Sequence, residues 1–153
     1  MSCSNLRGIQ VAHFAHDRLQ GYQQTGPEDP NEEYGMAKKR VGVVLAGCGF
    51  LDGAEIHEAV LTLLSLDQRD ADVICMAPDI DQMHVVNHKA GEPSEGESRN
   101  VLAESARIAR CDVHDIAEIN ADDLDALVFP GGFGAVKNLC SWAVDGPACH
   151  VNA

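Results

Sequence analysis

The sequence has 153 residues, 45% of them hydrophobic, and a net charge of −13. These values fit one globular domain with a core and exclude collagen-like and wholly disordered chains. No apolar run approaches the roughly 18 residues of a membrane helix, so we expect no membrane contact. The basic residues, 11 against 24 acidic ones, do not cluster beyond Lys38–Arg40, which argues against nucleic-acid binding. Six cysteines without a CxxC pair indicate reduced thiols and a cytoplasmic location.

Residues 1–35 differ from the rest in composition. A breaker-rich, acidic stretch at Gln23–Glu33 is typical of a linker or of disorder. Met36 stands just before the first predicted strand, so one hypothesis makes residues 1–35 a disordered or non-native N-terminal extension of the reading frame. The alternative is a targeting segment, because residues 1–24 are poor in acids and contain two arginines.

Strand and helix signals alternate from residue 40 onward. Three short apolar runs predict strands: Val41–Ala46, Ala71–Ala77 and Asp125–Phe129. The first is typical of a strand covered on both faces, and the second of a buried strand. Three segments with helical spacing predict helices: residues 53–68, 99–110 and 135–144. A further short strand is predicted at Met83–His88. The alternation indicates an α/β fold with a parallel sheet, although such sheets normally have about five strands or more.

Two capping-box patterns precede the first two predicted helices. Asp52 is followed three residues later by Glu55, and Ser94 by Glu97. In this pattern the first residue caps the helix and the second bonds back to it. We therefore expect the first helix to begin near residue 53, with Glu55 as a capping partner.

The PGGFG segment at Pro130–Gly134 follows the third long strand. Glycines there allow a tight turn, and free backbone N–H groups before a helix can hold an oxyanion or a phosphate. The alternative is a tight turn without a ligand. The pattern is neither GxGxxG nor a Walker loop, which argues against a nucleotide, and we expect no cofactor.

The second candidate group lies in the first turns of the first predicted helix. Open α/β sheets place their sites at the carboxyl ends of strands, beside helix N-termini. Glu58 lies there without a capping duty, and a carboxylic acid in that place can shuttle protons if burial raises its pKa. The alternative for Glu58 is a solvated helix face. His57 is expected at the surface.

Cysteine and histidine residues offer weaker candidates. Cys48 follows the first strand and can be reactive near a helix N-terminus. His84 and His88 are four residues apart, which suits a metal on a helix but not on the predicted strand. We therefore expect no metal site.

Several stretches together resemble the ElbB family, the isoprenoid-biosynthesis (enhancing lycopene biosynthesis) proteins of the PfpI-like superfamily. They include VVLAGCG at Val43–Gly49, DGAEIHEA at Asp52–Ala59 and PGGFGA at Pro130–Ala135. The resemblance covers residues 40 to about 152. It implies a class I glutamine amidotransferase-like domain with a flavodoxin-like parallel sheet sandwiched by helices. Within residues 36–153 this domain would be partial and incomplete at its C-terminus.

The resemblance also implies an activity. Family members are described as glyoxalases that convert glyoxal to glycolate, an activity linked to protein deglycation, and mitochondrial relatives occur in animals. A cysteine thiolate adds to the aldehyde, a glutamate moves a proton from C1 to C2, and amides of the PGG turn hold the oxyanion. Glu58 matches the glutamate, with Glu55 as a weaker candidate, and Gly131 and Gly132 match the oxyanion turn.

The family's elbow cysteine matches no residue, because it would lie beyond residue 153. We therefore expect the N-terminal portion of an ElbB-like glyoxalase, linked to isoprenoid biosynthesis and inactive alone, whose substrate is a small 2-oxoaldehyde such as glyoxal. One alternative is a non-catalytic module of the same fold that binds a small molecule or a partner. Another is an enzyme that uses Cys48 as its nucleophile. The resemblance allows a homodimer and a mitochondrial rather than cytoplasmic location.

Overall fold

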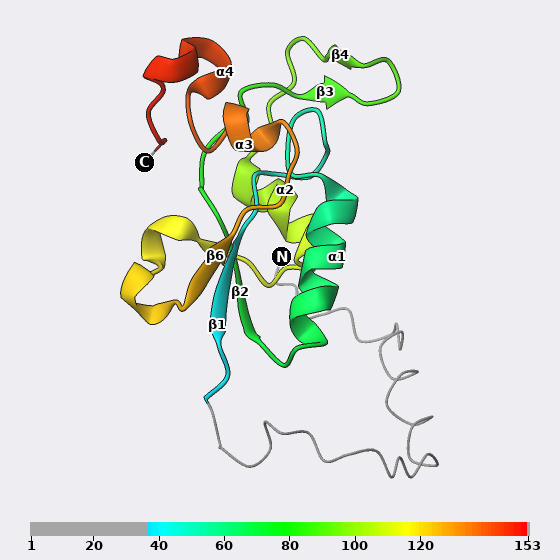
Figure 1. The fold of residues 1–153 in the computed structure, drawn as a ribbon. Coiled ribbons are helices and arrows are strands. Elements are labelled where there is room, and N and C mark those ends of the chain that lie inside the picture. The colour runs from blue at the N-terminus through cyan, green and yellow to red at the C-terminus, as the bar shows by residue number, and fades with distance from the viewer. Residues whose placement is uncertain (1–36, 153) are drawn as a thin grey trace, which may run out of the picture. The chain divides into compact units, whose positions relative to one another are not determined.

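The computed structural model describes residues 37–152, so the predictions for residues 1–35 lie outside the described part of the chain. Its main sheet has the order β5 (His114–Asp115), β2 (Asp72–Ala77), β1 (Arg40–Val44) and β6 (Ala126–Val128), as Figure 1 shows. All three pairings are parallel, and Val41 of β1 lies opposite both Val73 and Ala126. The predicted α/β fold with a parallel sheet is confirmed.

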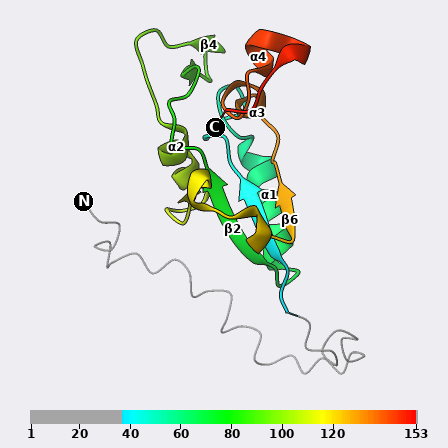
Figure 2. The same ribbon diagram turned by 90° about the vertical axis from the view of Figure 1, so that its left-hand side faces the viewer.

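Two helices cover one side of this sheet. Helix α1 (Ile56–Asp67) links β1 to β2, and α2 (Val101–Ile108) leads from β2 toward β5. Both steps run in the same direction across the sheet, so right-handed crossovers place both helices on the same face. The return from β5 to β6 runs through two short 3₁₀ turns, η3 (Ile116–Glu118) and η4 (Ala121–Asp123), which lie on the other side (Figures 1 and 2).

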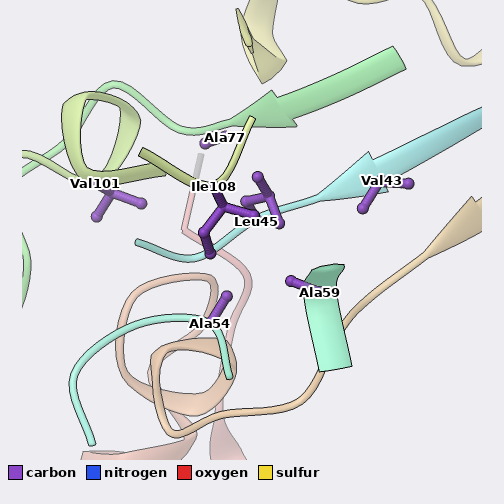
Figure 3. Packing of buried hydrophobic residues seen from close by; sticks show 7 residues of the cluster. All are labelled: Val43, Leu45, Ala54, Ala59, Ala77, Val101 and Ile108. Atoms are coloured by element: carbon purple, nitrogen blue, oxygen red, sulfur yellow. The ribbon is translucent and has the colours of Figure 1, made fainter. Parts of the chain in front are cut away.

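The core lies between the sheet and these two helices. Val43 and Leu45 alternate onto the helix-covered face, and both are fully buried. They pack with small residues of the first loop and α1 and with branched residues of α2, as Figure 3 shows: Ala54, Ala59, Val101 and Ile108. The first two apolar runs predicted as strands therefore contribute to this core, whereas the third run, at Asp125–Phe129, does not.

The predicted start of the first helix is wrong by three residues. Helix α1 begins at Ile56, and its cap is Glu55, whose carboxylate accepts the Glu58 N–H. Asp52 cannot cap the helix because its side chain is buried and accepts the Val86 N–H at 2.7 Å. The cap of α2 is likewise Asn100 and not Ser94.

The helix predicted at residues 135–144 is two short helices, α3 (Gly134–Lys137) and α4 (Trp142–Asp145), followed by the 3₁₀ turn η5 (Gly146–Ala148). The break falls at Asn138, whose side chain is buried. It accepts a hydrogen bond from the Met83 N–H and donates one to the Ala46 carbonyl.

The short strand predicted at residues 83–88 is present as β3 (Val86–Asn87). It pairs antiparallel with β4 (Glu92–Pro93). No helix within residues 37–152 is long and apolar enough to cross a membrane.

Candidate functional site

The glycine turn after β6 packs directly on the first turn of α1. The Gly131 N–H donates to Glu58 Oε2 at 2.7 Å, and the Gly131 carbonyl accepts the Glu55 N–H at 2.7 Å. A Cβ at position 131 would lie 2.1 Å from Glu58 Oε2, so a residue with a side chain would displace the carboxylate. The structure therefore brings together Glu58 and the turn that the sequence singled out.

Gly132 occupies a conformation that suits glycine. Its φ is +107°, and a Cβ there would lie 2.4 Å from the Gly53 carbonyl oxygen. The amides of Phe133 and Gly134 donate to the carbonyls of Phe50 and Gly53. Within residues 37–152 the Gly132 N–H donates to no acceptor. Because Glu58 already accepts the Gly131 N–H, the amide of this turn that is open to an oxyanion is that of Gly132.

Glu58 is exposed in the described part of the chain. Residues 37–152 therefore do not bury the carboxylate to which the sequence assigns proton transfer.

Glu55 acts as a cap. Its carboxylate accepts the Glu58 N–H at 2.7 Å and lies 3.0 Å from His57 Nδ1. The hydrogen bond from the Glu58 backbone, followed by that from His57, lowers the pKa of Glu55. A carboxyl held in its charged form suits capping and does not suit an acid. His57 is exposed, as predicted.

Cys48 lacks the features of an activated nucleophile. Its thiol is half-buried against the core, and this burial raises its pKa, with a further contribution from the Glu104 carboxylate. A raised pKa disfavours the thiolate, which is the reactive form. The structure gives no support to the hypothesis of a Cys48 nucleophile.

Sequence reasoning missed a buried aspartate beside the site, which pairs with a histidine that is 35% exposed. Asp52 is 2% exposed, and its Oδ1 has no hydrogen-bond partner within residues 37–152. His88 Nε2 lies 3.6 Å from this oxygen, while His88 Nδ1 lies 3.0 Å from the Val86 carbonyl. The capping pattern concealed the pair, because it assigned Asp52 to the helix. Within the described chain no group of three His, Cys, Asp or Glu residues is placed to hold a metal ion.

Two open hollows flank the contact between Glu58 and Gly131. Both residues line a groove of about 630 Å³ together with residues of α1 and the end of β6. Glu55 and Gly132 line a hollow of about 400 Å³ on the other side, walled by Phe50, Phe133 and Val136. A small molecule in either hollow would therefore touch one of the two glutamates and one of the two glycines.

The fold is that of an amidotransferase-like α/β domain. A solved structure shares this fold: the isoprenoid biosynthesis protein with amidotransferase-like domain from Ehrlichia chaffeensis, with a TM-score of 0.64 and 50% identity. The similarity covers 66% of this chain and 47% of that one. No family model matches the sequence.

Sequence relatives lead to the same class. The human glutamine amidotransferase-like class 1 domain-containing protein 3, mitochondrial, is 58% identical over 113 residues, which are 74% of this chain and 42% of that protein. The rat ES1 protein homolog, mitochondrial, is 57% identical over 115 residues, 75% and 43% of the two chains. The zebrafish ES1 protein, mitochondrial, is 39% identical over 116 residues, which are 73% of this chain and 43% of that protein.

The chain is thus a homologue of glutamine amidotransferase-like class 1 domain proteins. It spans less than half the length of the relatives that it matches. The resemblance to ElbB in particular stays a prediction. The relatives' names favour the mitochondrial alternative for location and do not support the cytoplasmic prediction.

Proposed function

We propose that this chain carries the acid and the oxyanion amide of a glyoxalase-type site of the ElbB kind, which converts glyoxal to glycolate. The observation that carries the proposal is the 2.7 Å contact between Glu58 Oε2 and the Gly131 N–H, next to the open amide of Gly132. It holds a carboxylate and a hydrogen-bond donor at the end of the same strand. A proton-transfer reaction at a carbonyl compound needs both groups.

The reaction requires a thiolate, and Cys48 is unsuited to supply it because burial raises the pKa of its thiol. The thiolate adds to one aldehyde carbon of glyoxal. The substrate must lie between the two hollows, over the Glu58–Gly131 contact, because the Gly132 N–H that holds the developing oxyanion lines the hollow on the other side from Glu58. Glu58 takes the proton from that carbon and returns it to the second carbon, which turns the hemithioacetal into a thioester. Water then cleaves the thioester to glycolate and regenerates the thiol. The net reaction adds one water and uses no oxidant or reductant.

The experiment uses a chimera, because the relatives are longer than the match. In the human relative, the matched 113 residues are replaced by the corresponding residues of this chain. We expect the chimera to form glycolate from glyoxal and the 153-residue chain alone to form none.

Glu58→Gln should lower kcat of the chimera about 100-fold or more, since a positioned acid-base group contributes about 10²–10⁴-fold. Glu95→Gln is the matched control, because Glu95 is exposed and makes no contact with the turn. A chimera that is folded but inactive, or one that tolerates Glu58→Gln, rules out the proposal. Activity of the short chain that is lost on Cys48→Ser would instead assign catalysis to Cys48.

The exposure of Glu58 favours a second candidate function. In this alternative the domain is a non-catalytic module that binds a small molecule or a partner through the same turn. Binding of glycolate to the folded chimera, seen as shifts of the Gly132 amide signal without any turnover of glyoxal, would favour the module over the enzyme.

A mitochondrial location and a role in isoprenoid supply complete the proposal. The first follows the names of the three relatives, and the second follows the name of the Ehrlichia protein. Cell fractionation with an antibody against residues 37–152 tests the location. Recovery in the cytosolic fraction alone would exclude it.

A further inference from the structure

The His88 ring lies between a hydrogen-bond donor and a hydrogen-bond acceptor of the loop that precedes α1. The Leu51 backbone N–H donates to His88 Nε2 at 3.4 Å, and Asp52 Oδ1 lies 3.6 Å from the same nitrogen. The other ring nitrogen, Nδ1, lies 3.0 Å from the Val86 carbonyl oxygen. Because a carbonyl only accepts hydrogen bonds, Nδ1 carries a hydrogen in this contact. Nε2 is therefore the nitrogen that gains or loses a proton while the contact with Val86 is kept.

The two proton states of Nε2 select different partners. In the neutral ring Nε2 carries a lone pair, which accepts the Leu51 N–H. Asp52 Oδ1 then has no hydrogen-bond partner within residues 37–152, and this is the arrangement of the structure. In the protonated ring Nε2 donates a hydrogen, which suits the Asp52 carboxylate and leaves the Leu51 N–H without its acceptor. One proton thus exchanges one contact for the other.

The burial of Asp52 makes this exchange energetically important. Asp52 is 2% exposed, and a polar atom without a partner at such a place costs free energy. The His88 side chain is 35% exposed, so protons reach it from the solvent. Two cations lie nearby along the chain or in contact with the loop: Lys89 follows His88, and Lys137 of α3 donates to the Leu51 carbonyl. Neither can accept a hydrogen from the ring, and the carboxylate in contact with His88 among residues 37–152 is that of Asp52.

Phe50 connects His88 to the glycine turn. The Phe50 ring packs edge-on against the His88 ring, with the ring centroids 5.5 Å apart. The Phe50 carbonyl accepts the Phe133 N–H at 2.8 Å, and both phenylalanines wall the hollow that Gly132 lines. Leu51, whose N–H depends on the His88 ring, is the next residue of the loop. A shift of the backbone at Phe50 and Leu51 therefore moves one wall of this hollow.

We propose that His88 is a pH-sensitive switch that acts on the glycine turn through Phe50. When the pH falls, a proton from solvent binds Nε2, whose hydrogen bond moves from the Leu51 N–H to Asp52 Oδ1, and the backbone at Phe50 and Leu51 becomes more mobile. Histidine is the side chain that ordinarily changes charge between pH 5 and 8, so a change of pH within this range operates the switch. The switch does not depend on the glyoxalase proposal, because it is tested without any substrate.

The test follows the ¹⁵N-labelled 153-residue chain by NMR from pH 8 to pH 5. We expect the amide signals of Leu51 and Phe133 to shift along one titration curve, with the same midpoint as the ring signals of His88. The protection of the Leu51 amide against hydrogen exchange, corrected for the pH dependence of the exchange chemistry, should fall at least fivefold at pH 5. His88→Gln should abolish both changes. His84→Gln is the matched control, because His84 is exposed on the same segment, and it should leave both changes intact.

Asp52→Asn distinguishes the switch from a general effect of acid. At pH 8 this variant should unfold at a higher urea concentration than the unchanged chain, because Asp52 Oδ1 has no partner there. At pH 5 the advantage should disappear or reverse. An asparagine that keeps its oxygen on the Val86 N–H turns an NH₂ group toward the protonated ring of His88, which cannot accept it. An advantage of the same size at both pH values overturns the proposal.

The chimera with the human relative gives the same measurements in a longer chain, which covers the case in which the 153-residue chain does not fold alone. A folded chain or chimera in which the Leu51 and Phe133 signals do not follow the titration of His88 overturns the proposal, whether or not it turns over glyoxal. So does a titration of these signals that persists in His88→Gln, because another group would then cause it.

Discussion

The two sides of the first turn of α1 are built in opposite ways. On one side, the loop from β1 to α1 is closed by polar side chains that are almost fully buried: Asp52, Gln82 and Asn138. On the other side, the groove along β6 leaves Leu61 and Phe129 more than half exposed. The polar contacts that fix the glycine turn thus lie within residues 37–152, which leave the apolar side of the same turn exposed.

The contacts that position the glycine turn are therefore different from those that would bury it. Gln82 and Asn138 both donate to the Asp52 carbonyl, which fixes the loop that precedes α1. The loop in turn receives the Gly134 N–H at the Gly53 carbonyl and so holds the glycine turn. Substitutions on the closed side should therefore change stability strongly, and those on the open side should change it little.

Asn138→Ala should have the largest effect. The Asn138 side chain accepts the Met83 N–H and donates to the carbonyls of Ala46 and Asp52, all at 2.9–3.0 Å. Its loss leaves buried groups without partners and should lower the free energy of unfolding by about 3–5 kcal/mol in urea denaturation.

The control for this prediction is Asn120→Ala, where an exposed cap of η4 is lost at a cost of about 1 kcal/mol. Equal effects of the two substitutions would show that the buried contacts of Asn138 do not close the loop.

Gly132→Ala should have the next largest effect. The new Cβ would meet backbone atoms of Gly53 and Glu55 at 2.4–2.5 Å, in a left-handed conformation, so the turn must move. We expect a loss of about 2–3 kcal/mol in the same assay. Gly96→Ala, at a similar positive φ but with nothing within 4 Å, should cost about 1 kcal/mol. A smaller loss at Gly132 than at Gly96 would contradict the packed turn.

The sequence allowed the fold and the meeting of Glu58 with the glycine turn to be predicted, but for different reasons. Short apolar runs are typical of strands, so β1, β2 and β6 could be predicted within one or two residues, although β6 is largely exposed. The carboxyl ends of parallel strands share one edge of a sheet, which brought Glu58 toward Gly131. The catalytic role of these residues stays a prediction.

The errors share a physical cause. Asp52 matches a capping pattern, but its tertiary contact with Val86 is a buried hydrogen bond that local sequence does not encode. Asn138 lies within a helical pattern and is recruited by loops 55 and more residues away. β5 has two residues and lacks an apolar run. At Asp52 and Asn138 a long-range polar contact overrides a local preference, whereas β5 is too short to leave a pattern in the sequence.

Asp52→Asn should raise stability slightly. An asparagine keeps the oxygen that accepts the Val86 N–H and replaces the partnerless Oδ1 with an NH₂ group that faces His88 Nε2. Removal of a buried oxygen without a partner should raise the free energy of unfolding by about 1 kcal/mol. Asp122→Asn, at an exposed position, is the control and should change it by less than about 0.5 kcal/mol. A clear loss of stability would mean that the buried charge itself is required.

Leu61→Gln should have the smallest effect on folding. It tests directly whether the groove side of α1 is open, in contrast to the closed side. Leu61 is 60% exposed, so it buries little apolar area within this chain, and its replacement should change the free energy of unfolding by less than about 0.5 kcal/mol. Leu45→Ala is the contrasting core substitution, since Leu45 is fully buried and its truncation should cost about 2–5 kcal/mol. Leu61→Gln should nevertheless reduce the binding of a hydrophobic dye such as ANS, because it removes apolar surface from the groove. A loss of stability at Leu61 close to that at Leu45 would mean that the groove is part of the chain's own core and is not an open surface.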